Sequence, residues 1–171
     1  MLGITVQQLS EGDKGIYETA EKMVEMIRTE STTYYVRQWA EVIIQDVPER
    51  DKWGEVKALY NFVKEHIRYT RDMIEMEYIQ GPTYLLSKIG SGETALGDCD
   101  DSTVLLLSLL RTIGFMVRVK LTGYAPSEEF THVYGEVLID EHGWVPVDTI
   151  VERFTVGDEA PNPIRVKLYE V

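Results

Sequence analysis

The segment Gly97–Leu110, with the sequence GDCDDSTVLLLSLL, decides the fold prediction because it joins a glycine-rich approach to an apolar run. Asp98 is a favoured N-cap residue, and Asp101 stands three positions later, where it nearly completes a capping box. Gly114 is a natural stop for the helix. The pattern therefore predicts a helix of about four turns whose first residue is Cys99.

Cys99 is the only cysteine of the chain. Unpaired backbone N–H groups and the positive end of the helix dipole favour its thiolate, whereas Asp98, Asp100 and Asp101 oppose a further negative charge. We therefore expect a cationic partner that tips the balance and gives an accessible thiol with a lowered pKa. The alternative is a small buried core residue, which fits poorly with aspartates on both sides.

The composition indicates one ordinary domain over residues 1–171. Hydrophobic residues make up 44% of the 171 positions, and the net charge is −12, with 29 acidic against 17 basic residues. This charge argues against a nucleic acid or an anionic membrane surface as partner. With one cysteine, no leader pattern and no apolar run of ~18 residues, we expect a cytoplasmic protein without internal disulfides.

Hydrophobic periodicity predicts helices first and strands later, which is typical of an α+β fold. Residues 1–12 could be a tail or one strand, and Tyr69–Gln80 shows no clear period. The helical N-terminal part covers about 13–90, and the cysteine helix with an antiparallel sheet covers about 97–171. Within the first part, one helix is expected to begin at Asp13, a second to be capped by Ser31 or Thr32 and to end at Val47, a third to begin at Asp51, and a short one to cover 83–89. Strands are expected over 116–124, 132–139, 144–150 and 164–168.

A thiol nucleophile needs a base, which is usually a histidine oriented by a carboxylate or an amide. The chain has three histidines. His66 falls in the last turn of a predicted helix, and His142 lies in an acidic turn. His132 opens a predicted strand directly after a loop, where a side chain can face a cleft. His132 is therefore the expected base.

Strand geometry suggests the third group. If Tyr134 lies opposite Asp148, then Ile139 lies opposite Gly143 and a three-residue loop joins the strands. His132 and Asp148 then become diagonal neighbours on one face, roughly 7–8 Å apart at the backbone.

Two observations qualify this pairing. Pro146 lacks a backbone donor, so its strand should lie at an edge or carry a bulge. Asp148 could also simply cap the turn at Thr149.

These motifs together resemble the transglutaminase-like superfamily of cysteine enzymes, within the papain-like fold. The resemblance extends from about Trp53 to Asp148, and the compact spacing is similar to that of bacterial, archaeal or phage members. The matching segments are Gly97–Asp101 with its helix to Gly114, Thr131–Tyr134 and Trp144–Asp148, preceded by Tyr60–Val63 and Ile67–Tyr69.

The resemblance implies thiol-dependent acyl transfer. Cys99 would attack a carboxamide or peptide carbonyl, His132 would move the proton, and Asp148 would hold the imidazole tautomer. The oxyanion would be bound by the Cys99 N–H and a second donor. Gln80 is a candidate for that donor, because papain-like relatives use a glutamine upstream of the cysteine; otherwise it is a loop residue.

The expected function is hydrolysis of a peptide or amide bond, as in a cysteine protease, with a peptide or protein as substrate. Transglutaminase (protein-glutamine γ-glutamyltransferase) activity is the alternative, and a non-catalytic interaction module on the same fold is another. A metal site from Cys99, His132 and the nearby aspartates would lack the paired ligand spacing of zinc motifs. We therefore expect no metal and no organic cofactor.

Overall fold

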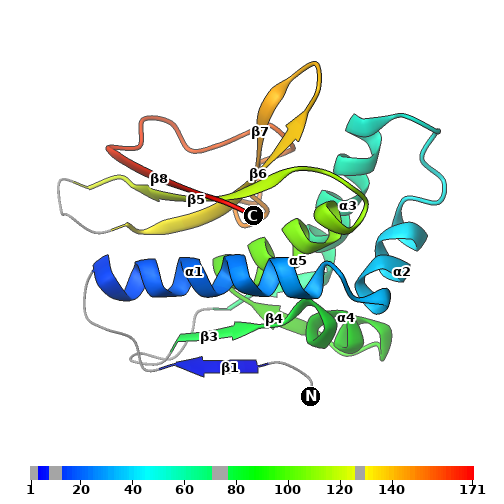
Figure 1. Ribbon diagram of the computed structural model, residues 1–171, viewed down its shortest axis with the longest axis horizontal. Helices are drawn as coiled ribbons and strands as arrows, with labels where there is room; N and C mark the ends of the chain where they lie inside the picture. The colour runs from blue at the N-terminus through cyan, green and yellow to red at the C-terminus, as the bar shows by residue number, and fades with distance from the viewer. Residues whose placement is uncertain (1–3, 8–12, 71–76, 126–129) are drawn as a thin grey trace.

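The computed structural model describes residues 4–7, 13–70, 77–125 and 130–171 (Figure 1). The helices are α1 (Asp13–Glu30), α2 (Tyr34–Ile43), α3 (Lys52–His66), α4 (Pro82–Gly90) and α5 (Cys99–Thr112). The strands are β1 (Ile4–Gln7), β2 (Ile67–Tyr69), β3 (Glu77–Gln80), β4 (Ala95–Gly97), β5 (Val117–Gly123), β6 (His132–Ile139), β7 (Gly143–Val147) and β8 (Arg165–Glu170). None of the helices within these described ranges is long and apolar enough to cross a membrane.

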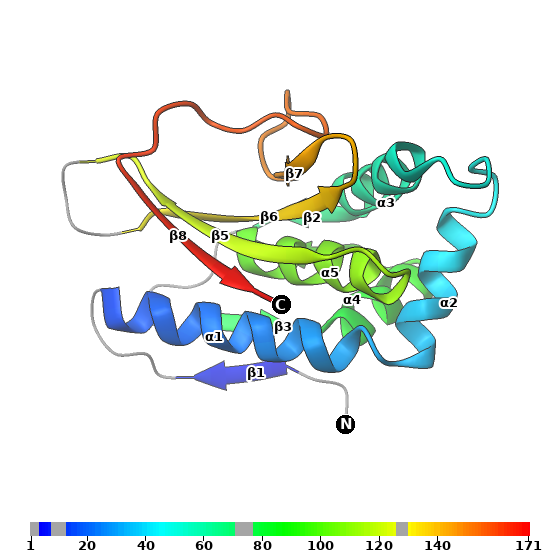
Figure 2. The same ribbon diagram turned by 45° about the horizontal axis from the view of Figure 1, so that its top comes forward.

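Helix α5 forms the centre of the molecule. All ten residues from Asp101 to Leu110 are buried, as expected for a helix that is apolar around its whole circumference. The four-stranded sheet covers one side of α5, and α1 runs along another (Figures 1 and 2). Cys99 thus stands at the half-buried start of a helix whose middle is fully buried.

The main sheet is antiparallel, with the strand order β7-β6-β5-β8. Ile139 pairs with Gly143 and Gly135 pairs with Val147, so the predicted register of this hairpin is confirmed. Gly143 supplies the positive φ of the connecting turn. Pro146 lies in β7 at the edge of the sheet, where its missing donor is tolerated.

Helix α5 packs closely against β6 at Gly135. A β-carbon there would lie 2.4 Å from Cδ2 and 2.9 Å from Cγ of Leu107. Glycine is therefore required at this position by packing rather than by backbone conformation.

Residues 1–12 contain one strand, β1, which was one of the two alternatives, whereas the short strands β2, β3 and β4 depart from the expected order of helices first and strands later. β1 pairs with β3 antiparallel, and β2 pairs with β4 in parallel. The segment 69–80 thus contains the end of β2 and all of β3, although its residues 71–76 lie outside the described part. The approach to Cys99, expected to be flexible, includes the paired strand β4. These strands have only three or four residues, which is too short for a period to show.

Several boundaries also differ. The second helix is capped by Thr33 and ends at Ile43 rather than at Val47. The strand expected over 144–150 ends at Val147, and the last strand extends to Glu170.

Candidate active site

Cys99 is the first residue of α5, as predicted. The Asp98 carboxylate accepts hydrogen bonds from the N–H groups of Asp100 (3.0 Å) and Asp101 (3.3 Å), and Asp101 accepts one from the Asp98 N–H (3.3 Å). This reciprocal capping box satisfies donors that an isolated helix start would leave unpaired. It fixes the position of Cys99 at the helix terminus.

Asp101 also connects this terminus to the end of β3. Its carboxylate accepts hydrogen bonds from the backbone N–H and the side-chain amide of Gln80, both at 2.7 Å. Burial raises the pKa of Asp101 to about 7, although these N–H donors lower it. Asp101 is thus a structural residue of the site.

Gln80 uses both hydrogens of its side-chain amide in this arrangement. One is donated to Asp101, and the other to the carbonyl of Leu96 at 2.8 Å. To bind an oxyanion, the amide would have to give up one of these bonds. Its role as oxyanion donor stays a prediction.

His132 and Asp148 are joined by a hydrogen bond of 2.8 Å between Nε2 and Oδ2. His132 is the first residue of β6, and Asp148, which is 1% exposed, follows the last residue of β7. Asp148 also accepts the Ile150 N–H through Oδ1 at 3.0 Å, so it caps the turn and contacts the imidazole at once. Because a carboxylate only accepts, Nε2 must be the donor, and Nδ1 keeps its lone pair.

The other two histidines have different partners. Nδ1 of His66 lies 2.8 Å from the Phe62 carbonyl, and His66 stacks on the ring of Phe62. His142 packs on Trp53 with ring centroids 4.9 Å apart. Of the three, His132 is the one held by a carboxylate.

Cys99 and His132 line the same cavity, which has a volume of about 130 Å³. Asp100 and residues of α1, among them Ile16 and Met23, form other parts of its wall. The contribution of α1 was not predicted, because its apolar residues show only the stripe of an ordinary core helix. The cavity therefore has a mainly apolar side and a polar side with the thiol and the imidazole.

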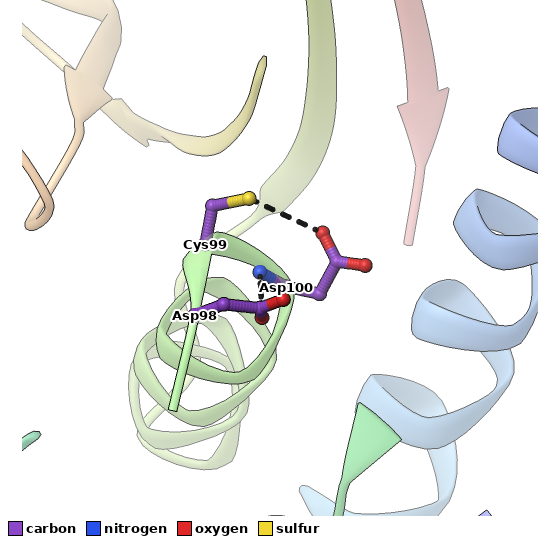
Figure 3. Close-up of side chains that lie close together, drawn as sticks. All are labelled: Asp98, Cys99 and Asp100. Carbon is purple, nitrogen blue, oxygen red and sulfur yellow. Dashed lines mark hydrogen bonds between the residues drawn. The ribbon is translucent and has the colours of Figure 1, made fainter. Parts of the chain in front are cut away.

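The sulfur of Cys99 is directed to a carboxylate rather than to the imidazole. Sγ lies 3.6 Å from Oδ1 of Asp100 (Figure 3) and accepts a hydrogen bond from the backbone N–H of Val133. Within the described residues, no hydrogen bond joins Sγ to His132. Cys99 and His132, the expected nucleophile and base, thus share a cavity without a direct hydrogen bond between them.

The pKa of Cys99 is raised, which corrects the expectation of a lowered one. Burial is the main cause, the charges of Asp100 and Asp98 add to it, and the Val133 N–H opposes it. Among the described residues, the expected cationic partner is not bonded to the sulfur, so no positive charge offsets the two carboxylates. Burial and the two carboxylates therefore favour the neutral thiol over the thiolate.

Changing Asp100 to asparagine should make Cys99 more reactive at neutral pH. Of the two carboxylate charges that raise the thiol pKa, the substitution removes the one with the larger effect. We expect the rate of iodoacetamide alkylation of the wild-type chain to rise only at pH values above the pKa of a free thiol, which is about 8.5. The pH profile of Asp100→Asn should be shifted to lower pH.

The single cysteine makes this measurement specific. Glu152→Gln, which removes an exposed carboxylate elsewhere, should leave the alkylation profile unchanged. Superimposable profiles of the wild type and Asp100→Asn would contradict the role given to the Asp100 charge.

Asp98, Cys99 and Asp100 have ligand atoms within 4.8 Å of one another. The group unites one soft sulfur with two hard oxygens and does not include His132. Zinc sites combine several thiolate or imidazole ligands, so these residues fit such an ion poorly. We assign no metal to the cluster.

Comparisons with known proteins bear on the fold and on the family of the chain. No curated protein matches the chain in a sequence search. Two solved structures share its fold: a candidate protease from Parabacteroides distasonis ATCC 8503 (TM-score 0.58, 11% identity, 89% of this chain and 28% of that one) and a candidate cysteine protease from Cytophaga hutchinsonii (TM-score 0.54, 11% identity, 97% and 58%).

The chain spans 28% and 58% of the lengths of these two structures, and its organisation as a single domain stays a prediction. The sequence model of the transglutaminase-like superfamily matches residues 37–149, which is more than half of the chain and includes Cys99, His132 and Asp148. The chain belongs to the transglutaminase-like superfamily.

Proposed function

We propose that the chain is a cysteine hydrolase that cleaves a peptide or amide bond with Cys99 as nucleophile, His132 as base and Asp148 as the group that orients the imidazole. The observation that carries the proposal is that His132, which lines the same cavity as Cys99, is hydrogen-bonded to Asp148. A histidine oriented in this way beside a thiol is the arrangement that nucleophilic catalysis requires.

In the proposed reaction, the thiol first turns from Asp100 towards His132. Nδ1 takes the thiol proton while Sγ forms a bond to the substrate carbonyl carbon. The imidazolium then gives this proton to the leaving nitrogen, the C–N bond breaks and a thioester remains. Water, activated by Nδ1, resolves the thioester and restores the free thiol.

The start of α5 supports the negative charge that develops on the carbonyl oxygen. The positive end of the helix dipole, together with the Cys99 backbone N–H, favours an anion at this position. The neutral resting thiol fits this scheme, because the imidazole then acts as a general base within the reaction.

Hydrolysis and transfer can be separated by how the thioester is resolved. We expect the purified chain to cleave casein or members of a fluorogenic peptide library without any added amine, and Cys99→Ala to abolish this activity. Support for hydrolysis also comes from the two structural relatives, which are described as candidate proteases.

The alternatives give different results in the same assay. Incorporation of a dansylated amine into a glutamine substrate without hydrolysis would replace the proposal with transglutaminase activity. Neither signal across a broad library would favour the non-catalytic interaction module.

A further inference from the structure

Two side chains of α3, Tyr60 and Lys64, hold the turn that follows β7. The Tyr60 hydroxyl lies 2.8 Å from the backbone carbonyl of Asp148 and 2.9 Å from that of Phe154. The Lys64 ammonium donates to the carbonyls of Val151, at 2.9 Å, and Phe154, at 2.5 Å. These bonds attach the turn that carries Asp148 to α3, a helix outside the sheet.

The two donors have separate tasks. Tyr60 has one hydroxyl hydrogen but two carbonyls in reach. The Phe154 carbonyl already has the Lys64 ammonium as donor, so the tyrosine hydrogen is assigned to Asp148. Burial, with the Asp148 charge second, raises the pKa of Tyr60, so the hydroxyl stays a donor throughout the neutral pH range.

Asp148 needs such support because it lies beyond the last paired residue of β7, which is Val147. Its side chain is short, so a shift of its main chain moves the carboxylate by a similar amount. Tyr60 is 2% exposed and belongs to a helix face packed in the core, which makes it a rigid anchor.

We propose that Tyr60 is a positioning residue that fixes the main chain of Asp148 and thereby keeps the Asp148 carboxylate on Nε2 of His132. Its kinetic consequence rests on the proposed function, whereas its effect on the His132 hydrogen bond does not. The chain of contacts runs from α3 through the turn to the strand that presents the base.

The chain offers a matched pair of variants. Tyr60→Phe removes the hydroxyl and leaves the Asp148 carbonyl without this donor, while Phe154 keeps Lys64. Lys64→Met removes the ammonium from the carbonyls of Val151 and Phe154 and from the Tyr60 hydroxyl. The hydroxyl keeps the Asp148 carbonyl as the nearer of its two acceptors, at 2.8 Å against 2.9 Å. If the turn needs only general attachment to α3, both variants should affect His132 equally.

The first readout is the imidazole N–H signal of His132 in NMR spectra of protein with ¹⁵N-labelled histidine. Only three histidines contribute, and a His132→Ala sample assigns the signal. We expect an Nε2–H resonance in the wild type and in Lys64→Met, protected from exchange by the bond to Asp148. In Tyr60→Phe it should be broadened or lost, as in Asp148→Ala.

The second readout is turnover. Tyr60→Phe should lower kcat, by up to about 100-fold for a displacement near 1 Å, with little change in KM because no substrate contact is removed. Lys64→Met should keep kcat near the wild-type value. Thermal melts establish that each variant is folded, and Tyr60→Met, which also lacks the hydroxyl, replaces Tyr60→Phe if phenylalanine prevents folding.

An Nε2–H signal in folded Tyr60→Phe as sharp as in the wild type would overturn the inference, as would equal losses in Tyr60→Phe and Lys64→Met. A wild-type chain without turnover would instead count against the proposed function. In that case the NMR comparison would still decide the role of Tyr60.

Discussion

Replacing His132 with alanine should lower the rate of Cys99-dependent amide hydrolysis by a factor of ~10²–10⁴, the usual contribution of a positioned general acid–base group. The effect should be large because the raised pKa of Cys99 leaves little thiolate at neutral pH. Without the imidazole, the Asp100 carboxylate is the acceptor that remains beside the thiol, and a carboxylate is a much weaker base than an imidazole. Initial rates on the best library peptide at neutral pH measure the loss.

The other two histidines provide the control. His66→Ala and His142→Ala should keep rates near those of the wild type, because these side chains contact Phe62 and Trp53 rather than the cavity. Asp148→Asn should also lower the rate, since an amide can present the wrong group to Nε2. A folded His132→Ala variant with an unchanged rate would show that the base lies elsewhere.

Replacing Gly135 with alanine should destabilise the fold by about 1–3 kcal/mol, the usual cost of forcing an extra group into a packed core. The new methyl group would lie 2.4 Å from Cδ2 of Leu107, a residue that is 0% exposed and has little room to move. Urea unfolding, followed by tryptophan fluorescence, gives the change in the free energy of unfolding.

A double-variant cycle tests the cause. Leu107→Ala alone should cost about 2–5 kcal/mol, but it removes the atoms that the new methyl group would meet. Gly135→Ala in the Leu107→Ala background should therefore be nearly neutral or slightly stabilising. Additive losses in the double variant would mean that the clash with Leu107 is not the cause.

The sequence was sufficient where the deciding interactions are local. The start of α5 at Cys99 depends on Asp98 and Asp101, which are close neighbours in the chain, and their capping box formed as expected. The register of β6 and β7 follows from one short turn and from strand parity. This register places the side chains of His132 and Asp148 on the same face of the sheet, where they are in contact. A slip of one residue would put them on opposite faces.

The pairing of the short strands could not be predicted from the sequence because their partners are distant along the chain. Ile4 pairs with Gln80 and Ile67 pairs with Ala95, and three or four residues carry no readable period. Tyr60 was hidden for a related reason. Its place in an apolar helical stripe gives no indication that its hydroxyl reaches the turn after β7.

The electrostatic state of the thiol was decided mainly by tertiary structure. The sequence showed the helix terminus and the aspartates, but the pKa of Cys99 depends mostly on how deeply the surrounding elements bury its sulfur and on which neighbour the sulfur contacts. Local sequence thus determined which residues stand at the helix start and on the paired strands. Burial and long-range contacts, to which the whole fold contributes, determined the protonation of the Cys99 thiol and the hydrogen bonds that hold the main chain of Asp148.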